Sequence, residues 1–385
     1  MGYALSTIWH ERNRFLPAIL AVSFSAVLIV LQTGLLLGLL TMMSTPVDKA
    51  EADIWIGYPG VRSVDLGQPI PEAWQNSLWE QPEVDRVETC VMGFAPWSMP
   101  ASAKRADALT EVCMVIGTEL HTDSIAVLEP LRRQPELLAT LGAHMSVLID
   151  ESERERLGVR QVGDQAVIMS HTVHVVGFVH GLKSLGGPYV FCSLETAKTI
   201  IYLIPEQSTF VLAHCRNHMD AARVAQRLRA SQELQNYPSA AIFTSDEFST
   251  RSRLHWMTTT KAGLALAFTA CLGLIVGAVV TSQTLYAATL ASQREYATLR
   301  AMGIPRWRLM LSVLAQSFWV GLAGIMVAVP ITLALAWLAD AIGTHVRMPA
   351  EVVAPAGLVT LAMAIASGLW ALRSLQRVDP AHNIR

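Results

Sequence analysis

Four uncharged apolar segments constrain this chain more than any other feature. They cover residues 15–47, 262–293, 309–339 and 352–372, and none of them contains Asp, Glu, Lys or Arg. A helix needs about 20 apolar residues to cross the hydrocarbon core of a bilayer. We therefore predict one membrane span before a long hydrophilic segment, residues 48–261, and three spans after it. The first segment exceeds the apolar core of about 7–15 residues in a signal peptide, so we expect an uncleaved anchor.

The charges between these segments predict their orientation. Residues 1–14, 291–308 and 373–385 together contain nine Arg and three acidic residues, whereas residues 48–261 contain 26 acidic and 19 basic residues. Short cytoplasmic segments of membrane proteins are enriched in Lys and Arg. We expect both termini and the 291–308 segment in the cytoplasm, with the large hydrophilic domain and the 340–351 loop on the other side. An even number of spans agrees with this arrangement.

The hydrophilic segment alternates short β-rich runs with helical stretches, which predicts an α+β domain over residues 48–245. Residues 121–205 could form an inner lobe. A helix over residues 246–290 is expected to begin as a stalk outside the bilayer and continue as the second span, and the end of the 15–47 helix is expected to form a partner stalk. Nine strands are predicted, at residues 53–58, 84–92, 111–117, 145–149, 165–169, 171–179, 189–192, 209–215 and 240–244.

Helix starts in this domain are marked by residues that cap helices. Asp150, Ser193 and Asn217 each precede a helical stretch, and their side chains can accept a hydrogen bond from a free backbone N–H. Thr244 and Glu247 have the spacing of a capping box, in which each side chain bonds the other residue's N–H. The stalk helix is therefore predicted to start at this pair.

The basic segment 291–308 is predicted to contain a short rigid helix. Good helix formers occupy residues 293–302, and Gly303 and Pro305 then end the helix. A basic segment can rest on anionic lipid, but a capped helix that mixes apolar and charged side chains also suits docking on a protein. The docking candidates are Glu295, Tyr296, Leu299, Arg300 and Met302, and the helix stop and interface anchor are Pro305, Arg306, Trp307 and Arg308.

The sequence contains no recognisable catalytic or nucleotide-binding motif. GxxxxGK[ST] is absent, and residues 181–184, Gly-Leu-Lys-Ser, lack the adjacent Gly and Lys. No GxSxG nucleophile elbow occurs. The apolar segments also lack the ionisable residues that mark proton relays and ion paths. We expect a chain without catalytic, cofactor-binding or metal residues that does not hydrolyse ATP by itself.

Histidines and cysteines are weak metal candidates. His171 and His174 lie three residues apart in a predicted strand, so their side chains point to opposite faces. His214 and His218 lie on either side of a predicted strand-to-helix junction. We expect solvated or hydrogen-bonded histidines rather than ligands. The five Cys form no CxxC pair, and the four in the hydrophilic segment are expected to be buried thiols, although an oxidising compartment would permit a disulfide.

Two glycine pairs predict close helix packing. Gly34 and Gly38 in the first span, and Gly273 and Gly277 in the second, have the small-xxx-small spacing that lets membrane helices approach closely. These contacts could form within one protomer or between two.

The basic segment also carries a family resemblance. REYATLRAMGIPRWRL, residues 294–309, resembles the cytoplasmic coupling helix and following turn of ABC transporter permeases of the MacB/FtsX type. The one-plus-three arrangement of spans, residues 157–179 and the tail with Asp379-Pro380 are similar to the same family. Residues 52–72 resemble the start of the periplasmic domain in DevC-like permeases. The resemblance implies a type VII, MacB-like architecture in a bacterial inner membrane, with four transmembrane helices and a large periplasmic α+β domain.

The resemblance implies partners and a mechanism. It implies a homodimer or heterodimer of permeases bound to two copies of a separate cytoplasmic ABC ATPase, which would hold ATP and Mg. The docking helix would comprise Arg294, Glu295, Tyr296, Leu299, Arg300, Met302 and Gly303.

By mechanotransmission, the stalks would pass ATP-driven movement to the periplasmic domain. That movement would drive efflux of a lipid, glycolipid, peptide or toxic compound through a periplasmic adaptor and an outer-membrane channel. The alternatives are an FtsX-like subunit that activates a cell-wall hydrolase and a lipoprotein-extraction permease. Membrane lipid is an expected contact and nucleic acid is not.

Overall fold

The computed structural model describes residues 12–100, 110–184, 186–231, 240–259, 261–291, 298, 302, 305–341 and 350–375. The chain divides into two compact units. We call residues 39–260 the α/β unit, and residues 1–38 together with 261–385 the helical unit. Each is described by itself.

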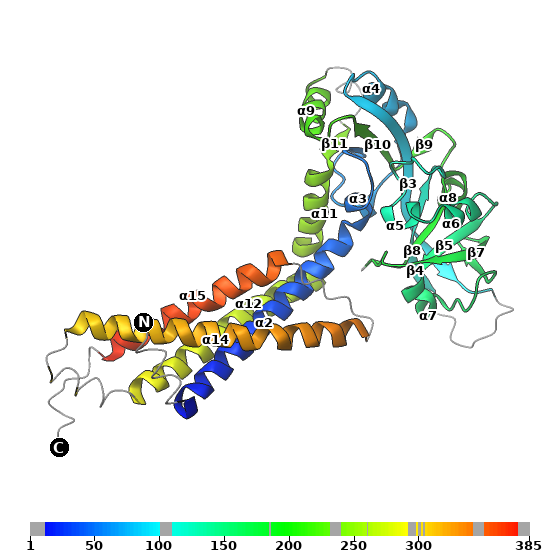
Figure 1. The fold of residues 1–385 in the computed structure, drawn as a ribbon. Helices are drawn as coiled ribbons and strands as arrows, with labels where there is room; N and C mark the ends of the chain where they lie inside the picture. Colours follow the sequence, from blue (N-terminus) through cyan, green and yellow to red (C-terminus); the bar gives the residue numbers. More distant parts are fainter. Residues whose placement is uncertain are drawn as a thin grey trace. The chain divides into compact units, whose positions relative to one another are not determined.

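A nine-stranded sheet organises the α/β unit, in the order β11-β1-β10-β3-β4-β8-β5-β7-β6 (Figure 1). The pairs β4–β8 and β5–β7 are parallel, and the other strand pairs of this sheet are antiparallel. The short strands β2 and β9 form a separate pair. The strands are β1 (Ile54–Gly57), β2 (Ile70–Pro71), β3 (Val84–Ser98), β4 (Glu111–Thr118), β5 (Ser146–Asp150), β6 (Gln165–Ile168), β7 (His171–Val179), β8 (Tyr189–Ser193), β9 (Gln207–Ser208), β10 (Phe210–Cys215) and β11 (Ala241–Thr244).

The long strand β3 belongs to two parts of this sheet. Its first half pairs with β10, and its second half pairs with β4. At its end Trp97 pairs with Ile168 of β6, which closes β3, β4, β8, β5, β7 and β6 into a barrel. The lobe predicted at residues 121–205 is therefore only part of the barrel, because β3 and β4 supply two of its strands.

The predicted strands all occur, and β3 differs most from its predicted range. It was predicted to end at Met92 but continues through Gly93 and Pro96 to Ser98. Over residues 91–96 one edge of β3 pairs with β4. Its other edge has no strand partner there, because the pairing with β10 ends at Cys90 and the pairing with β6 begins at Trp97. An edge without a strand partner tolerates a proline, which has no N–H to donate.

Helices of the α/β unit start where the capping residues predict. The Asp150 side chain accepts from Ser152 N–H, that of Ser193 from Thr196 N–H, and that of Asn217 from Met219 N–H. The described helices are α3 (Thr45–Asp48), α4 (Gln75–Trp79), α5 (Glu129–Arg132), α6 (Pro135–Thr140), α7 (Arg154–Leu157), α8 (Leu194–Ile201), α9 (Ala221–Ala230) and α11 (Ser245–Thr259), with 3₁₀ turns η1 (Val64–Leu66), η2 (Glu72–Trp74), η4 (Glu151–Glu153) and η5 (His218–Asp220).

The core of the α/β unit lies inside the barrel and under the helices. Trp97 is fully buried in the barrel, where its indole N–H donates to the Leu157 carbonyl at 3.0 Å. Val224 and Leu228 of α9 pack against β1 and β10 through Ile54 and Val211. The four cysteines of this unit are buried free thiols, as predicted, and burial raises the pKa of Cys113 and of Cys215 to about 12.

Among its described residues, the helical unit is built on four long helices (Figure 1), namely α2 (Arg12–Met43), whose last residues belong to the α/β unit, α12 (Lys261–Ala291), α14 (Arg306–Ala341) and α15 (Ala350–Leu375). Over the residues that the structure describes, three of them are long and apolar enough to cross a membrane, at Phe15–Met43, Ala267–Thr284 and Met310–Leu335. The fourth predicted span is also helical, but its apolar stretch among the described residues is shorter, Pro355–Leu369.

Small residues let these helices approach closely. A Cβ on Gly273 would lie 1.8 Å from Gln32 Oε1 of α2, and one on Gly277 would lie 3.2 Å from Ser25 Cβ. The Ser25 hydroxyl donates to Ala21 O at 2.9 Å and lies 3.3 Å from Gly277 O. The glycine pair of the second span therefore packs on the first span within one protomer. Gly34 and Gly38 are buried.

Candidate functional site

The predicted docking helix is only partly described. Arg294, Glu295, Tyr296, Leu299, Arg300 and Gly303 lie outside the described residues. The N–H of Met302 donates to the Thr298 carbonyl at 3.1 Å, the i to i−4 bond of an α-helix. Met302 is 67% exposed, so this predicted docking residue presents an apolar side chain that the chain itself leaves largely uncovered.

The predicted helix stop lies at the start of the next helix. Pro305 precedes α14, which begins at Arg306, and the N–H of Arg308 donates to Pro305 O at 3.0 Å. Trp307 is 57% exposed, and the Arg308 guanidinium lies 5.3 Å from its ring centroid. An exposed Trp beside an Arg suits an interface anchor. The helix α14 begins at Arg306, and its apolar span begins at Met310, close to the predicted start of the third span at residue 309.

The α/β unit joins its entering and leaving segments through a polar cluster, which we call the Asp48 clamp. It comprises Ser44, Asp48, Ser249 and Arg253. Asp48 Oδ1 accepts from the Ser249 hydroxyl at 2.6 Å, and Oδ2 accepts from Arg253 Nη2 at 2.6 Å and from Ser44 at 2.7 Å. Arg253 Nε also donates to Ser44 Oγ at 2.8 Å. Hydrogen bonds between ionised groups are stronger than neutral ones, so the clamp fixes α11 to α3.

Beside the clamp, four aromatic residues hold α11 on the sheet. This aromatic anchor comprises Trp55, Phe210, Phe243 and Phe248. Phe248 of α11 is fully buried, and its ring centroid lies 5.7 Å from Trp55, 5.6 Å from Phe210 and 5.1 Å from Phe243. Buried aromatic pairs with centroids 4.5–7 Å apart stabilise a fold beyond their area burial. The anchor binds α11 to strands β1, β10 and β11.

The start of α11 is fixed by the predicted capping box. Thr244 N–H donates to Glu247 Oε2 at 3.1 Å, and Glu247 N–H donates to Thr244 Oγ1 at 3.3 Å. A hydrogen bond and ion pair from Arg229 of α9 also holds the Glu247 carboxylate and lowers its pKa. Both predicted partners of the box are therefore confirmed, and α9 is tied to the same point.

One face of α11 makes all these contacts. This face includes Phe248, Ser249 and Arg253, and two further residues. The Ser252 hydroxyl accepts from Val64 N–H at 3.1 Å. The Trp256 indole N–H donates to Asp65 at 3.2 Å. Residues spaced by three, four and seven positions lie on one face of a helix. Neither Asp48 nor Arg253 was predicted from the sequence. The helical spacing of polar and aromatic residues after the capping box is the signal that could have indicated this face.

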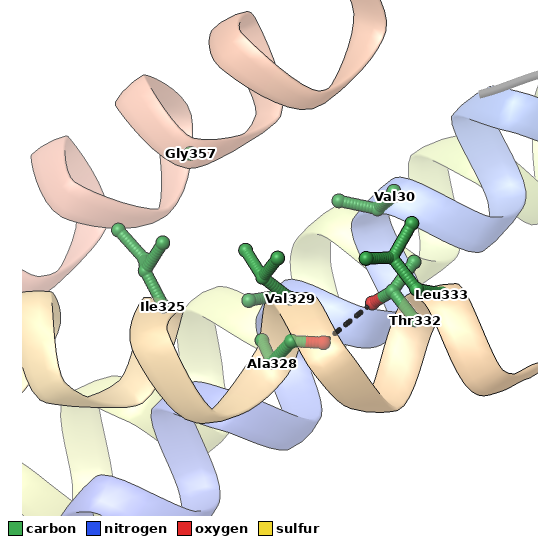
Figure 2. A pocket seen from close by; sticks show the side chains of 8 residues that line it. Val30, Ile325, Ala328, Val329, Thr332, Leu333 and Gly357 are labelled. Carbon is green, nitrogen blue, oxygen red and sulfur yellow. Dashed lines mark hydrogen bonds between the residues drawn. The ribbon is translucent and has the colours of Figure 1, made fainter. Parts of the chain in front are cut away.

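The helical unit contains a small apolar cavity between α2, α14 and α15 (Figure 2). Figure 2 shows Ile325, Val329 and Leu333 of α14 beside it, and Val30 of α2. The Thr332 hydroxyl donates to the Ala328 carbonyl at 2.8 Å, which satisfies its proton within the helix. The lining residues carry no charge. This cavity therefore offers hydrocarbon packing rather than polar recognition of a solute.

Among the histidines, the structure separates one pair and joins the other. His171 is half-buried, with its ring centroid 5.4 Å from that of Tyr202, whereas His174 is exposed. The ring centroids of His214 and His218 lie 5.3 Å apart. Both histidines of the second pair are hydrogen-bonded to carboxylates, as expected, since His214 Nδ1 lies 2.7 Å from Asp85 Oδ1 and His218 Nδ1 lies 2.5 Å from Asp53 Oδ1.

Two family matches cover most of the chain. The MacB-like periplasmic core domain matches residues 15–231, and the FtsX-like permease C-terminal domain matches residues 267–380. No curated protein matches the chain.

Three solved structures are similar to part of the chain. The periplasmic region of MacB from Actinobacillus actinomycetemcomitans is 13% identical and covers 52% of this chain and 92% of its own, with a TM-score of 0.35. The extracellular domain of YknZ from Gram-positive bacteria is 10% identical and covers 50% and 98%, with a TM-score of 0.34. A domain of a permease protein from Porphyromonas gingivalis is 14% identical and covers 51% and 90%, with a TM-score of 0.31.

The first family match spans more than half of the chain, and the second covers the helices that follow the α/β unit. Permeases of this family act with a cytoplasmic ATPase. The chain belongs to the MacB/FtsX family of ABC transporter permeases.

Proposed function

We propose that this chain is the permease subunit of an ABC exporter and is not itself catalytic. A separate ATPase, present in two copies, binds ATP and Mg and docks on residues 294–303 in the cytoplasm. Two permease copies convert its hydrolysis into movement of the α/β unit in the periplasm. That movement drives efflux of a lipid, glycolipid, peptide or toxic compound.

The observation that carries this proposal is the fixed junction of the α/β unit. The chain enters the unit through α3 and leaves it through α11, and the Asp48 clamp joins these two segments directly. The aromatic anchor then holds α11 on the sheet. A force applied along either segment is therefore delivered to the whole unit. A chain that moves cargo outside the bilayer needs such a link and needs no ion path through its spans.

The contact with the ATPase is tested by charge reversal. Arg300→Glu and Glu295→Arg are expected to reduce recovery of the ATPase with the full-length permease in mild detergent at least tenfold. Arg133→Glu is the matched control, because this residue is exposed and its ion pair is with Glu129, four residues earlier in the same segment. Wild-type recovery from both reversed variants would refute docking at this helix.

The movement itself is tested by spin labelling. Cys271 is replaced by Ser, and a single label is placed at Tyr202, which is 63% exposed. The distance between labels in the two copies is expected to change when ATP is added to the complex with the ATPase. Arg253→Ala is expected to reduce this change, and Arg133→Ala is not. An identical distance distribution with and without ATP would contradict mechanotransmission.

The orientation of the chain in the membrane is tested by cysteine labelling. Cysteines introduced at Ser98 and Ser292 are expected to react with impermeant maleimide from opposite sides of the inner membrane, and labelling of both from outside would exclude the proposed topology.

The proteins that co-purify with the full-length permease distinguish an exporter from a signalling subunit. A periplasmic adaptor with a coiled-coil hairpin supports export to an outer-membrane channel, whereas a peptidoglycan hydrolase would identify an FtsX-like regulator.

A further inference from the structure

Three potential metal ligands from separate segments converge at one end of the sheet. They are Asp53, which precedes β1, His214 of β10 and His218 of η5, and one ligand atom from each lies within 4.8 Å of the others. Two imidazoles and a carboxylate form a ligand set that suits zinc and similar divalent transition metals. We propose that the α/β unit binds one such ion at this triad, with water in the remaining position.

The backbone fixes the Asp53 carboxylate before any ion binds. Asp53 N–H donates to the Ala213 carbonyl at 2.8 Å, and Cys215 N–H donates to Asp53 Oδ2 at 2.8 Å. These bonds hold the carboxylate between β1 and β10 and leave Oδ1 for a further partner. The Asp53 side chain is only 12% exposed, so the carboxylate is held in a partly desolvated position.

The His214 imidazole is oriented from behind by a second carboxylate. Its Nδ1 lies 2.7 Å from Asp85 Oδ1. An ionised carboxylate only accepts hydrogen bonds, so Nδ1 carries the proton and Nε2 keeps the lone pair that can bind a metal. Histidine ligands in metal sites commonly donate their other N–H to such a carboxylate, which raises their basicity. Asp85 is therefore a positioning residue for the proposed site.

The third ligand, His218, is hydrogen-bonded to the first, Asp53. His218 Nδ1 lies 2.5 Å from Asp53 Oδ1, and an ion would replace the proton between these two atoms. Bonds of about 2.0–2.1 Å in tetrahedral geometry separate ligand atoms by roughly 3.4 Å. This contact must therefore open by about 1 Å. The His218 side chain is 74% exposed, so its ring can make that movement without disturbing the core.

The triad lies next to the start of α11, the helix that the Asp48 clamp and the aromatic anchor hold. The Asp53 carbonyl accepts from Ser245 N–H at 2.9 Å, and Ser245 is the first residue of α11. An ion held by Asp53, His214 and His218 would therefore fix the 214–218 turn to the point where α11 begins. The proposed site would stiffen the attachment of α11 without touching the helical unit.

The test uses full-length protein in detergent, freed of any polyhistidine tag and stripped with chelator. Zn²⁺ titrated into it calorimetrically is expected to bind at one ion per chain, and Co²⁺ is expected to give visible absorption bands of tetrahedral coordination. His218→Asn and His214→Gln are expected to weaken Zn²⁺ binding at least tenfold, and Asp85→Asn about tenfold or more. His144→Asn, at an exposed histidine elsewhere in the same unit, is expected to bind as wild type.

Two results would overturn the proposal. One is the absence of Zn²⁺ binding to the wild-type protein below millimolar concentration. The other is wild-type affinity in both His218→Asn and His214→Gln. Because His218 is largely exposed, its variant is expected to keep the thermal midpoint of the metal-free protein, so a loss of binding reports the ligand rather than the fold.

Discussion

Replacing Phe248 by Ala is expected to detach α11 from the sheet. The side chain is fully buried, and its ring contacts three other aromatic rings. Truncating a buried Phe costs about 3–5 kcal/mol, because transfer energy is lost and a cavity remains. The Asp48–Arg253 pair is about one-third exposed on both sides, so its net contribution is about 1 kcal/mol or less. The aromatic anchor therefore contributes more to the attachment than the clamp does.

The assay is hydrogen exchange followed by mass spectrometry on the full-length protein. If α11 opens as a local unit, a loss of about 3 kcal/mol speeds exchange of peptides from residues 245–259 about a hundredfold. Phe248→Leu is expected to have a smaller effect, since Leu removes fewer buried atoms than Ala and leaves a smaller cavity. Leu254→Ala on the same helix, where the side chain is 52% exposed, is the control. Exchange within twofold of wild type in Phe248→Ala would refute the anchor.

Three further predictions concern other parts of the chain. Gly324→Ala is expected to lower the thermal midpoint, because its Cβ would lie 2.8 Å from Val22 Cβ and 3.2 Å from the backbone N of Ser23 on α2, and neither atom can turn away. Gly357→Ala, with open space at its Cβ, is the control, and equal midpoints would contradict this packing. A hydrogen bond from Arg227 lowers the pKa of Glu83 from 4.5 to about 2. This stabilisation is present above pH 4.5 and is lost as the pH falls toward 2, so Glu83→Gln should flatten the stability profile in that window. The buried thiols of the α/β unit, including Cys215, should react with maleimide only in denaturant; rapid labelling of native protein would show that they are accessible.

Local signals in the sequence predicted most of the α/β unit. Alternating apolar residues located the strands, and Ser193, Asn217 and the Thr244–Glu247 pair marked helix starts, because these features depend only on neighbouring residues. The course of β3 past Pro96 was not predictable in the same way. It depends on which strands flank β3, and that is set by residues far away in the chain.

The candidate site was less predictable for a similar reason. The junction joins Asp48 to Arg253 across 205 positions, and the proposed metal triad joins Asp53 to His218 across 165. Neither pair leaves a spacing pattern in the sequence. The docking helix is the opposite case, since its candidates lie in one short segment and were found by composition, capping and family resemblance. Their contacts stay a prediction, because most of these residues lie outside those that the structure describes.

The shared strand β3 sets limits on how this protein can be divided or recombined. A fragment that begins at residue 121 would lack β3 and β4 and would leave the edges of β6 and β8 unpaired. Exposed strand edges favour association with other chains, so such a fragment is expected to aggregate rather than fold. A chimera that exchanges barrels between two relatives must carry residues 91–118 together with 146–193, and its splice point would fall within β3, where the pairing changes from β10 to β4.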